Sequence, residues 1–325
     1  MITRFKGKKI SFSILVLLML LFPLLTGHSG YFMTLFVMTC IYAITAMALN
    51  LLVGYGGQVS IGNAGFLTFG GYTVAILLEK FDLSIWVLIP LAGILTAVIG
   101  LLIGLPAVRL SGHFLAVATL GFGISVPQIA LNWDSLTKGY NGMAVMRPSY
   151  LSSDTEFFYV ILISTLLIMW LIKNIVHSGI GRAFIAIRDS EVAAQATGIN
   201  VAFYKTLMFV ISAFFTGIAG GLYSYWVGFV SPEDFTIITS LLLLGMVVVG
   251  GLATISGPIL GAILFTVLPH FTDSFIGITN IVIGVAVILI IMYRPAGIVS
   301  ILELLKQKKE GTKHQVKEEV QNVNV

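Results

Sequence analysis

The sequence predicts an all-α fold, a polytopic bundle of about ten transmembrane helices with both termini in the cytoplasm. Three observations predict it. Hydrophobic residues make up 58% of the chain, charged residues only 10%, and the mean hydropathy is +1.02, which is too apolar for one soluble core. The apolar residues gather into runs long enough to cross a hydrocarbon layer about 30 Å thick. Basic residues collect on one side when these runs are taken as alternating spans.

Ten apolar runs are candidate spans, most of them roughly 17 to 25 residues long, the length a helix needs to cross a bilayer. The first follows four basic residues, as the core of a secretory signal would, but it is longer than such a core and no clear small-residue cleavage site follows it. We therefore expect a retained first helix. The eighth and ninth runs are short and rich in glycine. The predicted spans are 10–26, 31–53, 64–80, 83–105, 113–131, 156–173, 206–228, 237–251, 255–271 and 277–293.

Basic residues are distributed unevenly over the predicted loops. With the N-terminus inside and the spans alternating, fifteen lysines and arginines lie inside and three outside. Because basic residues accumulate on the cytoplasmic side of short loops, this count supports the orientation and an even number of spans. The outside residues are Lys80, Lys138 and Arg147, and the inside ones are Arg4, Lys6, Lys8, Lys9, Arg109, Lys173, Arg182, Arg188, Lys205, Arg294, Lys306, Lys308, Lys309, Lys313 and Lys317.

The distribution of charged residues also predicts how the chain is divided and which partners it has. We expect a basic cytoplasmic N-terminus over residues 1–9, a transmembrane domain over 10–305, and a charged, solvated tail over 306–325. Contact of the tail with anionic membrane lipid is an alternative. The net charge of +4 follows from the orientation bias, so no nucleic-acid partner is predicted.

Several kinds of chemistry have no signature in the chain. No predicted span centre carries an ionisable residue, which argues against ion coupling, because a coupled carrier needs groups that bind and release the ion. No Gly-x-x-x-x-Gly-Lys-Ser/Thr phosphate-binding loop occurs, so a separate subunit would have to bind ATP. The single Cys40 lies within the second span and predicts neither a disulfide framework nor a metal site. We therefore expect no catalytic residue and no cofactor.

Polar residues interrupt the apolar pattern between the second and third spans. Residues 54–72, GYGGQVSIGNAGFLTFGGY, place Gln58, Ser60 and Asn63 among glycines. Irregular polar backbone within a membrane is tolerated only where it is buried in protein or lines a water-filled cavity. The segment therefore lines a transport path or forms a tight turn followed by close helix packing. Thr119, in the small-residue stripe of the fifth span, is a fourth candidate for the lining.

A second glycine-rich element follows the eighth span on the same predicted side, over residues 249–258, VGGLATISGP. Paired interruptions in the two halves of a chain point towards an internal duplication with a path between the halves. Small residues four apart, such as Gly217 and Gly221, predict close approach of helix backbones.

The stretch from Ser178 to Lys205 is a long polar interruption, SGIGRAFIAIRDSEVAAQATGINVAFYK. We expect two small turns around Gly179 and Gly181, then a short helix capped by Asp189 or Ser190, whose side chains can accept hydrogen bonds from first-turn amides. Gly198 is expected to end this helix, because glycine tolerates the left-handed conformation. The layout is typical of a docking element or of a plain cytoplasmic loop.

Five segments together are more specific than any of these motifs. They read GYGGQVSIGNAGF, GLPAVRLSGHFLAVATLGFG, LTKGYNGM, the docking stretch quoted above, and VVVGGLATISGPILGA. In this order, over about residues 48–297, they resemble the permease subunits of branched-chain amino-acid ABC importers. The second segment is more similar to the longer of the two permease types that such importers combine.

The resemblance implies partners and residue roles. The expected partners are a second, related permease subunit, two cytoplasmic ATPase subunits, an extracytoplasmic solute-binding protein facing loop 132–155, and the lipid of a bacterial plasma membrane. In that family, the loop matching 178–205 holds the helix that binds the ATPase. The residues assigned to ATPase coupling are Arg182, Ala183, Ile187, Arg188, Asp189, Ala194 and Gly198, and those assigned to the translocation path are Gln58, Ser60, Asn63 and Thr119.

The solute is less closely defined than the class of transporter. Lys138 and Tyr140 replace small residues usual for the family in the loop expected to face the binding protein, which leaves that partner open. Urea or short amides, other hydrophobic amino acids, and sugars or nucleosides are alternatives within the family. An ion-coupled carrier and a passive channel are alternatives of another class.

Overall fold

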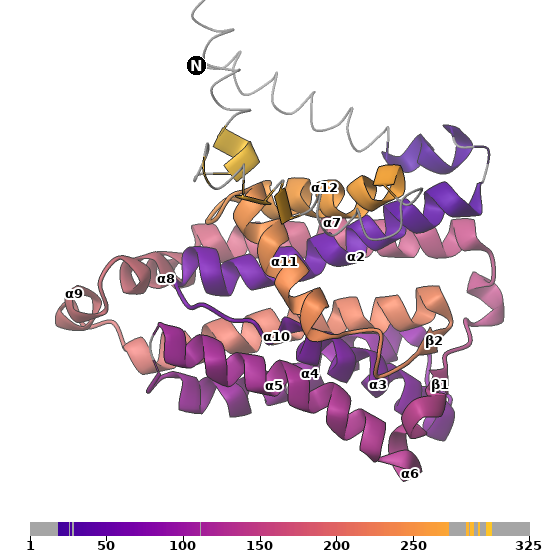
Figure 1. Ribbon diagram of the computed structural model, residues 1–325, viewed down its shortest axis with the longest axis horizontal. Helices are drawn as coiled ribbons and strands as arrows, with labels where there is room; N and C mark the ends of the chain where they lie inside the picture. Colours follow the sequence, from indigo (N-terminus) through magenta and orange to yellow (C-terminus); the bar gives the residue numbers. More distant parts are fainter. Residues whose placement is uncertain are drawn as a thin grey trace, which may run out of the picture.

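The computed structural model describes residues 19–25, 27, 29–110, 112–272, 284–285, 287–288, 292 and 297–300. Over this part the chain is helical apart from one sheet of two very short strands, in agreement with the predicted all-α class (Figure 1). The elements are α2 (Gly30–Asn50), the π-helix η1 (Leu51–Tyr55), α3 (Asn63–Phe81), α4 (Ile85–Ala107), α5 (His113–Asn132), α6 (Asp134–Thr137), η2 (Gly139–Asn141), β1 (Met143–Ala144), η3 (Ser149–Leu151), α7 (Asp154–His177), α8 (Gly179–Asp189), α9 (Glu191–Ala196), α10 (Val201–Val227), β2 (Phe229–Val230), α11 (Ile237–Gly250) and α12 (Gly257–Thr272).

Eight of the ten predicted spans coincide with helices, from α2 to α12. The predicted spans 10–26 and 277–293 lie largely outside the described residues. Within the described part, five helices are long and apolar enough to cross a membrane, namely α2 with its π-helical extension, α4, α5, α7 and α10. Helix α3 is as long as a span, but its polar first residue, its glycines and its charged last turn lower its hydropathy. Helices α11 and α12 are shorter.

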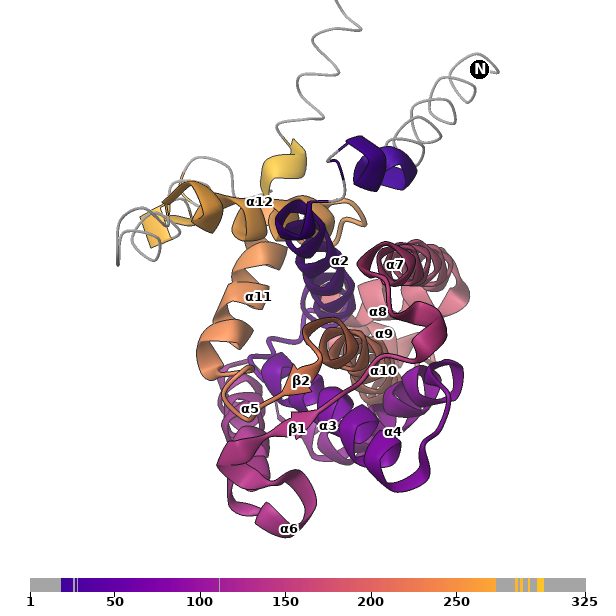
Figure 2. The ribbon, with the colours of Figure 1, turned by 90° about the vertical axis from the view of Figure 1, so that its right-hand side faces the viewer.

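Helix α10 lies at the centre of the bundle, packed against α2, α3 and α4 (Figure 2). Glycine permits this packing. A Cβ atom on Gly70 of α3 would lie 2.3 Å from the carbonyl oxygen of Gly217, and one on Gly217 would lie 2.4 Å from Oγ1 of Thr96 on α4. Backbones that approach so closely gain dispersion contacts that larger side chains would prevent. The close approach predicted at Gly217 is thus confirmed.

The two ends of the bundle differ in structure. Helices α8 and α9 lie at one end, called here the α9 end, and α6 with the β1–β2 sheet lies at the other, called the β1 end (Figure 1). The sheet is antiparallel and pairs Met143 with Val230 and Ala144 with Phe229. The predicted loop 178–205 ends at residue 200, because α10 begins at Val201, and the predicted loop 132–155 ends where α7 begins at Asp154.

Two helical stretches are interrupted inside the bundle. After the π-helix, residues 56–62 run from the α9 end back towards α10 before α3 begins (Figure 1). The second interruption, residues 251–256, separates α11 from α12. The start of α11 lies against the start of α3, where the Ala64 amide donates a hydrogen bond of 3.0 Å to Oγ of Ser240. Residues 56–62 are mostly buried, as polar backbone at membrane depth requires, whereas Leu252 and Ser256 of the second interruption are exposed.

Candidate functional site

The stretch at the α9 end begins with a helix where we expected turns. Residues 179–189 form α8, so the predicted turns around Gly179 and Gly181 are wrong. The Ser178 hydroxyl caps α8 by accepting a hydrogen bond of 3.2 Å from the Ile180 amide. A Cβ atom on Gly181 would lie 2.1 Å from the carbonyl oxygen of Val176, so the sharp junction between α7 and α8 requires glycine there. Gly179 and Gly181 therefore both lie in the first turn of α8.

The short helix α9 follows the predicted capping pattern. Of the two candidate caps, Ser190 is the one used, and its hydroxyl accepts a hydrogen bond of 3.2 Å from the Ala193 amide. Gly198 follows α9 with φ of +86°, the left-handed conformation expected of it. The carboxylate of Glu191 pairs with Nζ of Lys205 at 2.5 Å, and the Lys205 side chain is only 6% exposed. This ion pair ties α9 to the N-terminal part of α10.

The residues assigned to coupling divide into anchors and exposed groups. Ala183, Ile187 and Ala194 are buried, and Ile187 and Ala194 join Phe184 in an apolar cluster shared with α10 and η1. Their burial fixes α8 and α9 to the bundle and withholds their side chains from a partner. The exposed members are Arg182, Arg188, Asp189 and Gly198.

Val192 was missed by the sequence reasoning. It lies on α9 with 80% of its surface exposed, the largest exposed fraction among the large apolar side chains of the described residues. An apolar side chain at the tip of a polar element is suited to insertion into a partner's pocket. The signal in the sequence was a single valine inside a polar stretch.

Arg188 turns back into the protein. Its Nη1 donates a hydrogen bond of 3.2 Å to the carbonyl oxygen of Gly54 in the π-helix, and its Nη2 lies 3.0 Å from Oδ1 of Asp189. Gly57 packs on the aliphatic part of this side chain, because a Cβ atom there would lie 2.8 Å from Cγ of Arg188. The element at the α9 end is therefore joined directly to the start of the first interruption.

The four residues assigned to the path are all buried at this interruption, and three of them share an unusual property. Both side-chain polar atoms of Gln58 and of Asn63, and the hydroxyl of Ser60, are buried without a hydrogen-bond partner in the part of the chain that the structure describes. Buried polar groups are nearly always hydrogen-bonded. Groups without partners point to water or a ligand that meets them in some state of the protein.

Thr119 has a different role. Its hydroxyl accepts a hydrogen bond of 3.1 Å from the Ile61 amide and donates one of 3.0 Å to the carbonyl of Ala116. Thr119 thereby holds residues 56–62 against α5. It is a structural contact of the lining and offers no unused polar group to a solute.

The second interruption is held by a residue that the sequence reasoning did not single out. Asn50 at the end of α2 donates a hydrogen bond of 2.7 Å to the carbonyl of Thr254 and accepts one of 3.1 Å from the Ala253 amide. Ala253 has φ of +55°, a left-handed conformation that a residue with a Cβ atom seldom adopts. The two bonds from Asn50 support this strained turn. The two glycine-rich elements therefore lie side by side.

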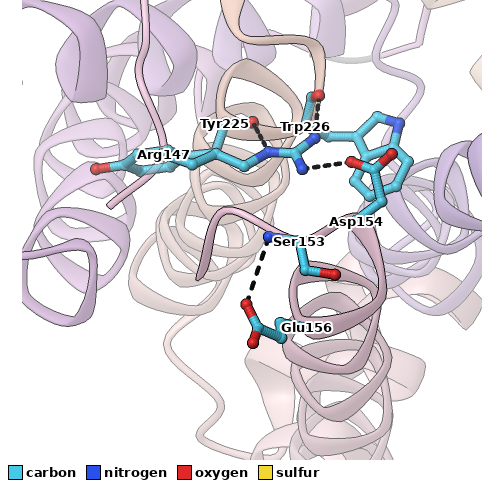
Figure 3. Close-up of polar contacts among 6 residues, drawn as sticks. All are labelled: Arg147, Ser153, Asp154, Glu156, Tyr225 and Trp226. Carbon is cyan, nitrogen blue, oxygen red and sulfur yellow. Dashed lines mark hydrogen bonds and ion pairs between the residues drawn. The ribbon is translucent and has the colours of Figure 1, made fainter. Parts of the chain in front are cut away.

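The β1 end is held together by Arg147. Its guanidinium donates to the carbonyl oxygens of Tyr225 at 2.9 Å and Trp226 at 2.7 Å, and pairs with Asp154 at 2.6 Å. Figure 3 shows it between the last turn of α10 and the start of α7, where the Ser153 amide donates to the Glu156 carboxylate. Carbonyls at a helix C-terminus attract a cation. Arg147 therefore fixes the loop that carries β1.

The surface of the β1 end is hollowed and carries charges. A pocket of about 630 Å³ is lined by residues that include Glu79, Asp82, Lys138, Arg147 and Tyr150. Lys138 pairs with Glu79 at 2.8 Å. Tyr140 and Met146, 76% and 79% exposed, lie on the same loop. The β1 end thus exposes charged and apolar side chains on a loop that Arg147 holds in place.

These features define a multi-pass helical membrane protein with a small group of polar side chains inside an apolar core and a separate polar element at one end. A family model described as "Branched-chain amino acid transport system / permease component" matches residues 31–293, and the chain belongs to this family.

Relatives support the same assignment. The high-affinity branched-chain amino acid transport system permease protein LivM of Salmonella typhimurium is 33% identical over 302 residues, covering 84% of this chain and 71% of the relative. LivM of Escherichia coli strain K12 gives the same values, 33% identity with 84% and 71% coverage. A probable permease protein LivH of Methanocaldococcus jannaschii is 24% identical over 76% of this chain and 83% of its own length. No solved structure matches the chain at a significant level.

Proposed function

We propose that this chain is the membrane-spanning permease subunit of an ATP-binding-cassette importer for branched-chain amino acids. The observation that carries the proposal is the family match over residues 31–293, together with relatives of that activity over 84% of the chain. The chain itself is not an enzyme in this proposal. ATP hydrolysis belongs to separate subunits, in keeping with the missing phosphate-binding loop.

The α9 end is the surface proposed to bind the ATPase subunits at the cytoplasmic side. Arg182, Asp189 and Gly198 are exposed there and Val192 projects from α9, while Ala183, Ile187 and Ala194 anchor the element. An anchored element transmits displacement, because buried packing resists deformation. Arg188 extends this connection to the backbone of Gly54. Closure of the ATPases would thereby move the first interruption.

The β1 end is the surface proposed to receive the solute-binding protein outside the cell. Arg147 holds the loop through three polar contacts, so the exposed Tyr140 and Met146 stand on a fixed frame. A prearranged surface lowers the entropic cost of binding a partner. With the α9 end inside, Lys80, Lys138 and Arg147 lie outside, as the charge bias predicts.

The path is proposed to pass the polar residues Gln58, Ser60 and Asn63, with Thr119 fixing their segment. Two permease subunits would enclose this path, since the relatives of this chain include permease proteins of two names, LivM and LivH. The binding protein selects the solute, so these residues need only weak contacts, which allow a solute to leave as well as enter. The plasma membrane of a bacterium is the proposed location.

The proposal is tested by purifying the chain with an ATPase, a second permease and a solute-binding protein of this transporter class from the same organism, and measuring ATP-driven leucine uptake in proteoliposomes. We expect uptake that needs ATP and the binding protein and that persists without an ion gradient. Uptake driven by an ion gradient alone would contradict the proposal.

The docking surface is tested separately with Arg182→Glu combined with Val192→Glu. We expect the ATPase to be lost from the purified complex. Arg109→Glu is the matched control, because Arg109 is also exposed and assigned to the same side but lies outside α8 and α9. Loss of the ATPase from both variants would show a general charge effect and contradict the assigned surface.

A further inference from the structure

Two hydroxyl residues of α10, Ser212 and Thr216, lie between a contact to the first interruption and a contact to α3. Met208, Ser212, Thr216 and Gly220 follow one another at intervals of four, so they form a continuous ridge along α10. The ends of the ridge contact the chain that runs from η1 into α3. A Cβ atom on Gly56 would lie 2.3 Å from Sδ of Met208, and one on Gly220 would lie 2.2 Å from the carbonyl oxygen of Leu67. Ser212 and Thr216 lie between these two contacts.

Neither hydroxyl is used in the described structure. Ser212 and Thr216 are 0% exposed, and their hydroxyl oxygens have no hydrogen-bond partner among the described residues. A buried hydroxyl in a helix ordinarily bonds to a carbonyl three or four residues earlier. Ser224 of the same helix does so at 2.9 Å, and Thr96 of α4 does so at 2.7 Å. The exception is therefore local to this ridge.

The chain that faces this ridge also carries buried polar groups without hydrogen-bond partners in the described structure. Between Gly56 and Leu67 lie Gln58, Ser60 and Asn63, whose side-chain polar atoms are also buried without partners in the described part. The five residues together hold seven such atoms. We name Gln58, Ser60, Asn63, Ser212 and Thr216 the inner polar strip. Buried polar atoms without partners are unfavourable, and several in one place favour any state in which they meet water or a polar molecule.

The strip is connected to the element that the ATPase would move. Arg188 of α8 bonds to Gly54 and packs on Gly57, which directly precedes Gln58. A shift of α8 therefore acts on residues 56–62, the segment that contacts the ridge at Met208, one helical turn before Ser212. Glycines at 56, 57 and 62 leave that segment few bulky side chains to hold it in place.

We propose that residues 56–62 move away from α10 during transport, and that the inner polar strip then binds the carboxylate and ammonium groups of the passing amino acid. This inference rests on the proposed function and adds Ser212 and Thr216 to the path.

The chemistry of the strip fits a zwitterion that must be released again. The amide nitrogens of Gln58 and Asn63 and the hydroxyls donate to a carboxylate, the amide oxygens accept from an ammonium group, and the first turn of α3 adds its dipole near the carboxylate. None of the five side chains is charged, so the contacts are weaker than those of a charged site.

Cysteine labelling tests the proposal in the assembled transporter. In a Cys40→Ala background, Ser212→Cys and Thr216→Cys are exposed to a small cationic methanethiosulfonate reagent, without nucleotide and with ATP plus vanadate. We expect both to react at least tenfold faster in one nucleotide state than in the other, and leucine supplied with the binding protein to slow the reaction. Ser224→Cys is the matched control, because Ser224 is equally buried on α10 but its hydroxyl is bonded.

The proposal is overturned if Ser212→Cys and Thr216→Cys are as unreactive as Ser224→Cys in both states. Leucine uptake by the unmodified complex is measured in parallel. Failure of the proposed function would appear there, whereas failure of the inner polar strip would appear only in the cysteine variants.

Variants without the hydroxyls give a second measurement that does not depend on labelling. We expect Thr216→Val and Ser212→Ala to keep or raise the thermal stability of the complex, because an unused buried hydroxyl is removed, and to lower leucine uptake several-fold. Unchanged uptake in both variants would contradict a solute contact. Ser224→Ala is the control and should leave uptake unchanged.

Discussion

The two interruptions of the helical bundle carry similar sequences but are held very differently. In residues 251–256, Asn50 bonds to both Ala253 and Thr254, and the Thr254 hydroxyl donates to the carbonyl of Gly251 at 2.7 Å and accepts from the Gly257 amide at 3.1 Å. In residues 56–62, the side chains of Gln58 and Ser60 have no hydrogen-bond partner among the described residues. Residues 251–256 therefore form a fixed turn, whereas residues 56–62 form a weakly held segment.

The difference teaches that a glycine-rich interruption does not by itself indicate motion. Side-chain hydrogen bonds decide whether the irregular backbone is locked, because a satisfied buried network resists rearrangement and an unsatisfied one does not. An internal duplication, which the sequence pattern suggested, would accordingly have left two related elements with separate roles. Three changes test this contrast, and a fourth tests the loop before α11.

The largest effect is expected for Asn50→Leu, which removes both bonds to the second interruption at nearly unchanged size. The Ala253 amide and the Thr254 carbonyl lose a partner, at roughly 1–3 kcal/mol each, so we expect a loss of about 2–6 kcal/mol. Thermal unfolding of the purified protein in detergent measures it. Gln58→Leu is the matched change in the first interruption and should not lower stability. Equal losses in the two variants would show that both interruptions are held alike.

A smaller loss is expected for Thr119→Val, which removes the one side-chain hydrogen bond that the described structure gives to the backbone of residues 56–62. The Ile61 amide loses its acceptor, and we expect a loss of about 1–3 kcal/mol in the same unfolding measurement. The control is Thr68→Val, because the Thr68 hydroxyl bonds only to a carbonyl of its own helix, at 2.9 Å. A Thr119 variant no less stable than the Thr68 variant would mean that the segment needs no such support.

Arg188→Met tests transmission to the first interruption. The variant keeps the aliphatic stem that packs on Gly57 and loses the bond to Gly54. We expect co-purification of the ATPase to be retained and leucine uptake per ATP hydrolysed to fall roughly fivefold, within the range for a residue that carries coupling. Arg182→Met, at an exposed residue of the docking surface, should instead weaken co-purification. An unchanged ratio of uptake to hydrolysis in Arg188→Met would exclude this route.

The smallest effect is expected at Asp234, in the loop before α11. Burial raises the pKa of its carboxyl above the ordinary value, the Ser231 amide opposes this by donating a hydrogen bond of 2.7 Å, and Glu233 adds to the rise. The folded state therefore holds its proton at a higher pH than the unfolded state does. The free energy of unfolding should rise as pH falls through the raised pKa towards the ordinary one.

The measurement is thermal unfolding over a pH series from neutral to acidic, comparing wild type with Asp234→Asn. The variant should lose this part of the pH dependence and should be slightly more stable than wild type at neutral pH. A variant that keeps the full pH dependence would assign it to another group.

Much of the architecture could be predicted because it depends on local properties of the chain. The lengths of the apolar runs located α2 to α12, and Ser190 and Gly198 marked the limits of α9. Helix α8 was missed because its glycines resembled turn signals, whereas its packing through Phe184 and Ile187, which no local pattern shows, helps to stabilise it. Gln58, Ser60 and Asn63 were identified by polarity in an apolar context, whereas Ser212 and Thr216 look like ordinary hydroxyls of a membrane helix.

The sequence by itself determined that this is a multi-pass helical membrane protein, which polar stretches interrupt it, and which family it belongs to, because hydropathy and motif order are properties of the chain alone. The tertiary structure decided which polar groups find partners. Asn50 meets Thr254 across 204 positions and Arg188 meets Gly54 across 134, and no local pattern encodes such pairs. Their presence locks one interruption and links the other to the α9 end, because a buried polar group is stable only where the fold brings it a partner.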